Sequence, residues 1–163
     1  MQGSRTKVET KNQTHPVLNG VGTIFAESDV YGVSPLAPAT ILLRGMLTET
    51  LESDSPVVTT GRGEKHMPVA WLREHSHGNG NSSKIFTTTM GAAVDLTDEN
   101  LRRLVINGIY WGLDLEVPQK ADAALQSTFI PTMYGFKDEG DGVRKGFLKK
   151  QTPSDLMNVD SSK

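Results

Sequence analysis

The chain has 163 residues, 36% of them hydrophobic, which fits one domain with an ordinary core. Its 17 basic and 19 acidic side chains give a net charge of −2, which argues against an electrostatically driven nucleic-acid or membrane-surface partner. The sequence contains no cysteine, so it holds no disulfide, no thiolate metal site and no cysteine nucleophile. No apolar run approaches the roughly 20 residues needed to span a bilayer.

The first half of the chain shows few regular elements. Residues 1–13 are polar and follow neither the helical nor the strand period, which predicts loop or disorder. Residues 23–25 and 29–33 resemble short extended pieces. Residues 40–47 form a dense apolar run whose length suits a strand buried on both faces, as in a sheet covered by helices. Residues 49–65 are punctuated by Ser, Asp, Pro and Gly and predict a long surface loop.

A hairpin and a helix are the clearest elements of the second half. Residues 67–73 and 84–90 are extended runs joined by a segment rich in Gly and Asn, which predicts a hairpin. A helix is predicted from about residue 98 to residue 112, with Thr97 as N-cap and Gly112 as C-cap. Apolar residues recur at helical spacing at Leu101, Leu104, Val105, Gly108 and Trp111. Arg102 and Arg103 are expected to point away from this buried face.

These elements together predict an α/β domain with too few helices. One helix cannot cover both faces of a doubly buried sheet, so we expect the N-terminal half of the domain to be missing. We expect residues 14–118 to form the domain and residues 119–148 to pack on it as an extended arm with several aromatic residues. Residues 149–163 are expected to be a disordered tail.

Four segments resemble, in order and spacing, motifs of the trehalose-utilisation (ThuA-like) domain family. The first is His15-Pro16-Val17-Leu18-Asn19-Gly20, and the others are MPVAWLR at 67–73, KIFTTTMG at 84–91 and LRRLVINGIYWG at 101–112. The resemblance implies a flavodoxin-like, class I glutamine amidotransferase-like sheet, of which this chain would be the C-terminal part. It departs from the family at Gly91-Ala92, where many relatives have Gly-His. The nucleophile elbow of the amidotransferase relatives would lie in the missing half.

This resemblance also implies a function. It links the protein to disaccharide or keto-sugar metabolism, with a small carbohydrate as ligand, no cofactor and no complete catalytic site in this chain. Two alternatives stay open: a non-catalytic ligand-binding or interaction module, and a truncated gene remnant. Exposed sheet surface around residues 41–43 would then favour self-association.

Five residues are candidates for contacting a sugar: Asp29, Tyr31, Arg73, Gly91 and Asp95. Arg73 ends a strand, where open α/β sheets place their ligands, although an edge arginine paired with an acid is the favoured alternative. Gly91 allows close backbone approach, and Asp95 can either bind a hydroxyl or cap a helix. Asp29 and Tyr31 lie together in a loop that resembles the family's and could line the same crevice.

The remaining chemical groups favour structural roles. Trp71 and Trp111 could stack on a sugar ring, but their positions on apolar faces favour core packing. His15 precedes a proline and more often orders a loop than transfers protons. Three imidazoles could ligate zinc, but the loop position favours exposed histidines over a metal site; they are His66, His75 and His77.

Overall fold

The computed structural model describes residues 3–28, 30–35 and 37–131, apart from the side chains of Val8 and Thr10. Within these residues the strands are β1 (Ser4–Val8), β2 (Phe25–Ala26), β3 (Thr40–Leu47), β4 (Met67–Ser76) and β5 (Ser82–Thr88). One α-helix, α1 (Glu99–Gly112), follows the sheet. Short 3₁₀ turns are η1 (Thr10–Asn12), η2 (Pro16–Leu18), η3 (Gly61–Glu64) and η4 (Asp95–Thr97).

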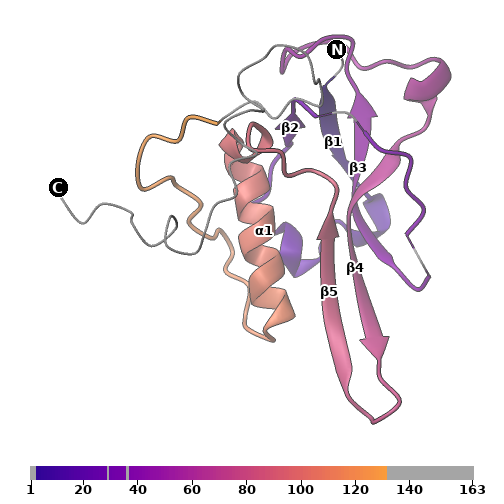
Figure 1. Cartoon of the computed structure of the whole chain (residues 1–163), viewed down its shortest axis with the longest axis vertical. Coiled ribbons are helices and arrows are strands. Elements are labelled where there is room, and N and C mark those ends of the chain that lie inside the picture. The colour runs from indigo at the N-terminus through magenta and orange to yellow at the C-terminus, as the bar shows by residue number, and fades with distance from the viewer. Residues whose placement is uncertain (1–2, 29, 36, 132–163) are drawn as a thin grey trace, which may run out of the picture. The chain divides into compact units, whose positions relative to one another are not determined.

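The five strands form one curled, half-barrel sheet in the order β2-β1-β3-β4-β5, and every neighbouring pair is antiparallel. Helix α1 runs alongside β5 (Figure 1). The expected parallel, flavodoxin-like sheet is therefore wrong for these residues. Parallel neighbours need a crossover connection, usually a helix, and neither residues 48–66 nor residues 77–81 contain an α-helix.

Strand β3 has the predicted bounds but a different environment. Leu42 and Leu43 are consecutive and both fully buried, which a regular strand achieves only when both faces are covered. Here the register shifts between Ile41 and Leu43 and again between Leu43 and Arg44, as at a β-bulge. The bulge and the curl of the sheet bury the apolar run, so no second layer of helices is needed.

Strand β1 corrects the prediction that residues 1–13 lack regular structure. It pairs with both β2 and β3, although its sequence is polar. The buried Thr6 hydroxyl accepts the N–H of Ile24 at 2.8 Å. The Arg5 guanidinium donates to the carbonyls of Ser53 and Ser55, each at 2.7 Å. Hydrogen bonds therefore satisfy the polar groups of β1, and a search for a hydrophobic period does not find this strand.

Helix α1 begins one residue later than predicted. Asp98, not Thr97, is the N-cap and accepts the N–H groups of Asn100 and Leu101. The C-cap is Leu113, one residue beyond Gly112. Leu101, Leu104 and Gly108 are buried as predicted; Val105 and Trp111 are half-buried.

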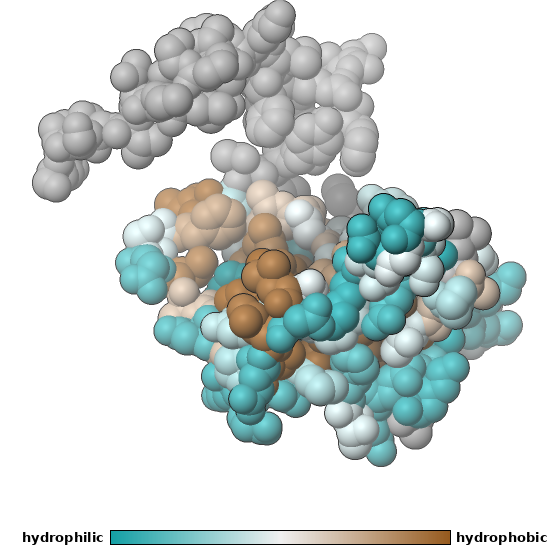
Figure 2. All heavy atoms as spheres, turned by 90° about the horizontal axis from the view of Figure 1, so that it is seen from below, coloured by the Kyte–Doolittle hydropathy of each residue, from teal (hydrophilic) through white to brown (hydrophobic). Residues whose placement is uncertain are grey.

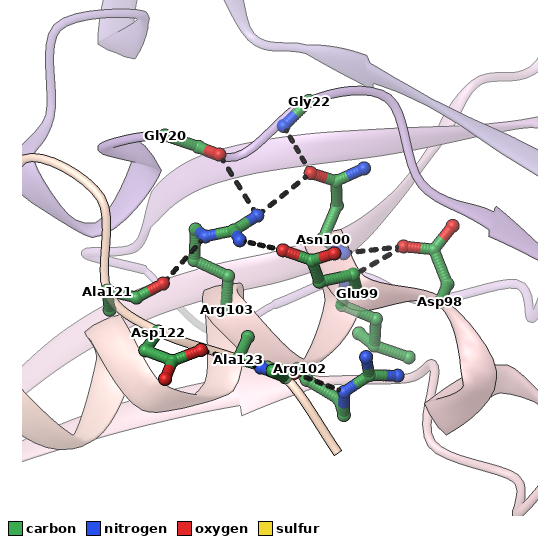
Figure 3. A network of polar contacts seen from close by, with 12 residues as sticks. Gly20, Gly22, Asp98, Glu99, Asn100, Arg102, Arg103, Ala121, Asp122 and Ala123 are labelled. Atoms are coloured by element: carbon green, nitrogen blue, oxygen red, sulfur yellow. Dashed lines mark hydrogen bonds and ion pairs between the residues drawn. The ribbon is translucent and has the colours of Figure 1, made fainter.

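Arg103 was expected to point away from the core, but only 3% of its surface is exposed. Its guanidinium donates to the carbonyls of Ala121 and Gly20 and pairs with Glu99 (Figure 3). Arg102 donates to the carbonyl of Ala123 at 2.7 Å. The two arginines thus bind the start of the expected arm to α1. Residues 132–148 of that arm, and the expected tail at 149–163, lie outside the described residues.

Leu42 and Leu43 lie in the apolar run at residues 40–47, and both are buried. The exposed apolar surface of the described residues lies elsewhere. Figure 2 shows apolar side chains gathered among polar ones on the face seen from below. The large exposed apolar residues of the second half are Ile85, Ile109, Leu113, Leu115, Leu125, Phe129 and Ile130. Most of them belong to α1 and the segment after it, and none of the helices in the described part is long and apolar enough to cross a bilayer.

Candidate functional site

A cavity of about 290 Å³ lies where four segments distant in sequence meet. These are the residue before η2, the start of β3, the outer part of β4 and the last turn of α1. Its lining residues are His15, Pro38, Ala39, Thr40, Leu72, Arg73, Glu74 and Trp111. The cavity thus combines an imidazole, an indole, a hydroxyl and a carboxylate, which suits a small polar ligand with an apolar face.

His15 is held in one tautomer at this cavity. It is the N-cap of η2, and its Nδ1 accepts the N–H of Val17 at 3.2 Å. A backbone N–H can only donate, so Nδ1 carries no proton and the neutral ring carries its proton on Nε2. Burial lowers the pKa of His15 below its ordinary value of 6.5, in agreement with this neutral form. His15 therefore offers the cavity a hydrogen-bond donor, since no described residue bonds to Nε2.

Trp111 is fixed from two sides. Its ring lies edge-on to the His15 ring, with centroids 6.4 Å apart and planes at 64°. The Lys84 ammonium lies 5.1 Å from the centroid of the indole, donates to the Trp111 carbonyl and pairs with Asp114. Trp111 is thus half-buried at a cavity and does not lie wholly in the core. Trp71 is only 8% exposed, as core packing predicts.

On β4, the charged group aimed toward α1 is Glu74 and not Arg73. Lys84 and Phe86 contact α1, and they pair in register with Glu74 and Leu72. Because side chains alternate along a strand, the Arg73 side chain lies on the opposite face. Its Nε is buried without a hydrogen-bond partner, and Arg73 makes no ion pair among the described residues. Arg73 borders the cavity, but its guanidinium is not directed to the same side as Glu74.

Asp95 is bound entirely by its own chain. Its carboxylate is 1% exposed and accepts the hydroxyl of Ser28 at 2.6 Å and the N–H of the same residue at 3.3 Å. It also accepts the N–H groups of Gly91 and Ala92, both at 3.1 Å. Gly91 has a φ of +151°, which favours glycine. The structure thus brings Gly91 and Asp95 together as a loop-closing network in which the carboxylate is already occupied.

The predicted contact residues that the structure describes do not gather in one place. Thr89 bonds to Val69, four residues before Arg73, so Thr89, two residues before Gly91, already lies about 14 Å from Arg73 along the hairpin at a rise of about 3.4 Å per residue. Tyr31 is 57% exposed, and Asp29 lies outside the described residues. The sequence analysis named His15 and Trp111 but favoured structural roles for both, and it gave Glu74 and Thr40 no part in a site. Glu74 directly follows the second motif, whereas Thr40 lies outside all four.

The three histidines weighed as metal ligands are separated. His66 precedes β4, and its carbonyl accepts from Arg44, whereas His75 and His77 lie at the other end of that strand. No group of three or more His, Cys, Asp or Glu side chains placed to hold a metal occurs in the part of the chain that the structure describes.

Comparison with protein-family models, with curated proteins and with solved structures finds no match to this chain. The sequence motifs and the geometry of the cavity are therefore the two indications of function.

Proposed function

We propose that the cavity at His15, Glu74 and Trp111 binds a small carbohydrate, in a ThuA-like protein linked to disaccharide or keto-sugar metabolism. One observation carries this proposal. Three of the four segments that resemble ThuA-like motifs supply residues to the cavity: His15 from the first, the end of β4 from the second and Trp111 from the last. The remaining segment supplies Lys84, which fixes Trp111. The support is this convergence and not a parallel sheet, which these residues do not form.

The chemistry of the lining suits a sugar. A sugar ring presents C–H groups to an aromatic surface and hydroxyls to donors and acceptors, and Trp111, the Nε2–H of His15 and the Glu74 carboxylate offer these partners. The volume of about 290 Å³ lies just below the range of about 300–1,000 Å³ for drug-sized ligand sites. One sugar ring therefore fits inside, and the second ring of a disaccharide would lie outside.

A non-catalytic binding module is the second candidate. It is favoured by the hydrogen bond of His15: the only basic nitrogen of that ring already accepts the N–H of Val17. A general base needs a free lone pair within reach of the proton it removes. In this arrangement His15 can orient a ligand but cannot deprotonate it.

Tryptophan fluorescence tests carbohydrate binding directly. The Trp71→Phe variant leaves Trp111 as the reporter, since the chain has two tryptophans. Titration with a panel of disaccharides, their keto derivatives and single sugars should give a saturable change in emission. Because a hydrogen bond to a charged group contributes about 1.5–3 kcal/mol, Glu74→Gln should raise the dissociation constant by roughly 10–100-fold.

The matched control is Glu64→Gln, which neutralises an exposed acid on η3 that does not line the cavity. This variant should bind as tightly as the parent. The absence of a saturable change across the whole panel would refute the proposal, and so would equal binding by the Glu74→Gln variant.

A further inference from the structure

We propose that His75 and His77, at the tip of the β4–β5 hairpin, chelate one divalent transition-metal ion such as Cu²⁺, Ni²⁺ or Zn²⁺. The two imidazoles are exposed, and their ring centroids lie 4.9 Å apart with the planes at 87°. This site is separate from the cavity and does not depend on carbohydrate binding.

The strand fixes the relative position of the two histidines. β4 extends to Ser76, so His75 lies within the ladder, paired with Ser83, and does not belong to a loose loop. The N–H of His77 donates to the carbonyl of Asn81 at 2.7 Å, which closes the turn. His75 lies directly opposite Ser83, and the Ser83 hydroxyl lies 2.8 Å from Nε2 of His77, so both imidazoles lie on the Ser83 side of the hairpin.

The separation of the rings matches a chelate. A metal lies about 2.1 Å from a histidine nitrogen, and the nitrogen lies about 1.1 Å from the ring centroid, so the metal lies about 3.2 Å from each centroid. Two centroids 4.9 Å apart then subtend an angle of about 100° at the metal. This value lies between the square-planar or octahedral angle of about 90° and the tetrahedral angle of about 109°.

Ser83 supplies the outer contact that metal-binding histidines require. Its hydroxyl lies 2.8 Å from Nε2 of His77, which can donate to it and leave Nδ1 for the metal. No third His, Cys, Asp or Glu joins the pair among the described residues, so water or another molecule completes the coordination shell. The hairpin tip projects beyond the nearby end of α1 (Figure 1), so these positions are accessible.

Imidazole ligands also determine which ions bind. They suit ions that are intermediate between hard and soft, such as Ni²⁺, Cu²⁺ and Zn²⁺. The affinity of such a site for these ions rises from Ni²⁺ to Cu²⁺ and falls again at Zn²⁺. Mg²⁺ and Ca²⁺ require oxygen ligands, which a pair of imidazoles does not supply. We therefore expect Cu²⁺ to bind most tightly and Mg²⁺ not to bind.

Isothermal titration of the full chain without a histidine tag, with Cu²⁺, Zn²⁺ and Mg²⁺, tests the proposal. We expect one Cu²⁺ per chain and nitrogen coordination in its electron paramagnetic resonance spectrum. His75→Gln and His77→Gln should each weaken binding at least tenfold, and Ser83→Ala should weaken it by roughly 10-fold through the outer contact. His66→Gln, at the opposite end of β4, is the matched control and should bind like the parent.

Two results would overturn the chelate. One is Cu²⁺ affinity that is unchanged in the double variant of His75 and His77, which would place the ion elsewhere. The other is one ion per two chains, which would show that each chain contributes too few ligands to hold an ion alone. Circular dichroism of the exposed-site variants should match the parent, so a loss of binding cannot be attributed to unfolding.

Discussion

The Arg103→Met substitution tests how the chain anchors its helix. The Arg103 guanidinium is buried and donates to the carbonyl of Ala121 at 2.9 Å and to that of Gly20 at 3.3 Å (Figure 3). It also contacts Glu99 and the side-chain oxygen of Asn100. Methionine fills much of the same volume but donates no hydrogen bond, so the substitution isolates the polar contribution.

The expected loss follows from the groups left behind. The carbonyl of Ala121, a buried residue, would lose its donor, and such an unsatisfied group costs about 1–3 kcal/mol, whereas Gly20 is exposed and its carbonyl can turn to water. The Glu99 side chain is 55% exposed and can return to water, so its ion pair adds little. We expect the free energy of unfolding to fall by about 1–3 kcal/mol, against the usual 5–15 kcal/mol of a single domain.

Urea unfolding followed by far-UV circular dichroism measures this loss. The control is Glu99→Gln, which removes the ion pair but leaves both carbonyls bonded, and should cost less than about 1 kcal/mol. Equal losses in the two variants would show that the ion pair dominates and would refute the reasoning. A loss below about 1 kcal/mol for Arg103→Met would also refute it, because the carbonyls would then have found other partners.

Three further predictions concern stability. Burial lowers the pKa of His15, so below about pH 6.5 the unfolded chain binds more protons than the folded chain. The free energy of unfolding should therefore fall as the pH drops from there and level off below the lowered pKa. His15→Asn should flatten this part of the profile of urea midpoint against pH. Gly108→Ala should destabilise by about 1–3 kcal/mol, because its Cβ would lie 2.7 Å from the Phe86 ring, whereas Gly112→Ala, in open space, should be neutral or stabilising in the same assay. Asp95→Ala should cost about 2–4 kcal/mol in thermal and urea unfolding, since the donors bound to its carboxylate lose their acceptor; a loss below about 1 kcal/mol would contradict this.

The hairpin and the helix could be predicted because their signals are local. Extended apolar and β-branched runs with turn residues between them define β4 and β5, and the 3.6-residue period defines α1, although its N-cap was placed one residue too early. The direction of the sheet was also present in the sequence, in the long segment after β3 that contains no helix. The family resemblance implied parallel strands, and the connection that such strands need was absent.

Other features depend on contacts that no local pattern records. β1 is stabilised by hydrogen bonds that Arg5 donates to Ser53 and Ser55 and that Thr6 accepts from Ile24, in segments that come later in the chain. Arg103 is buried because backbone carbonyls from both sides of the helix need donors. From sequence alone a charged residue is predicted to be exposed, because the partners that make its burial favourable are brought together only by the fold.

The cavity depends on the same kind of long-range contact. Asn107 is fully buried one helical turn before Trp111, and its amide donates to the carbonyls of Val17 at 3.0 Å and Asn19 at 2.9 Å. These two bonds fix η2 against α1, and η2 begins at His15, so they set the position of the imidazole relative to the indole. Asn107 read as an ordinary helical residue, because nothing nearby in sequence shows that it joins two distant motifs. The motifs could each be recognised alone, but their meeting at one cavity follows from this buried amide and could not be derived from their spacing.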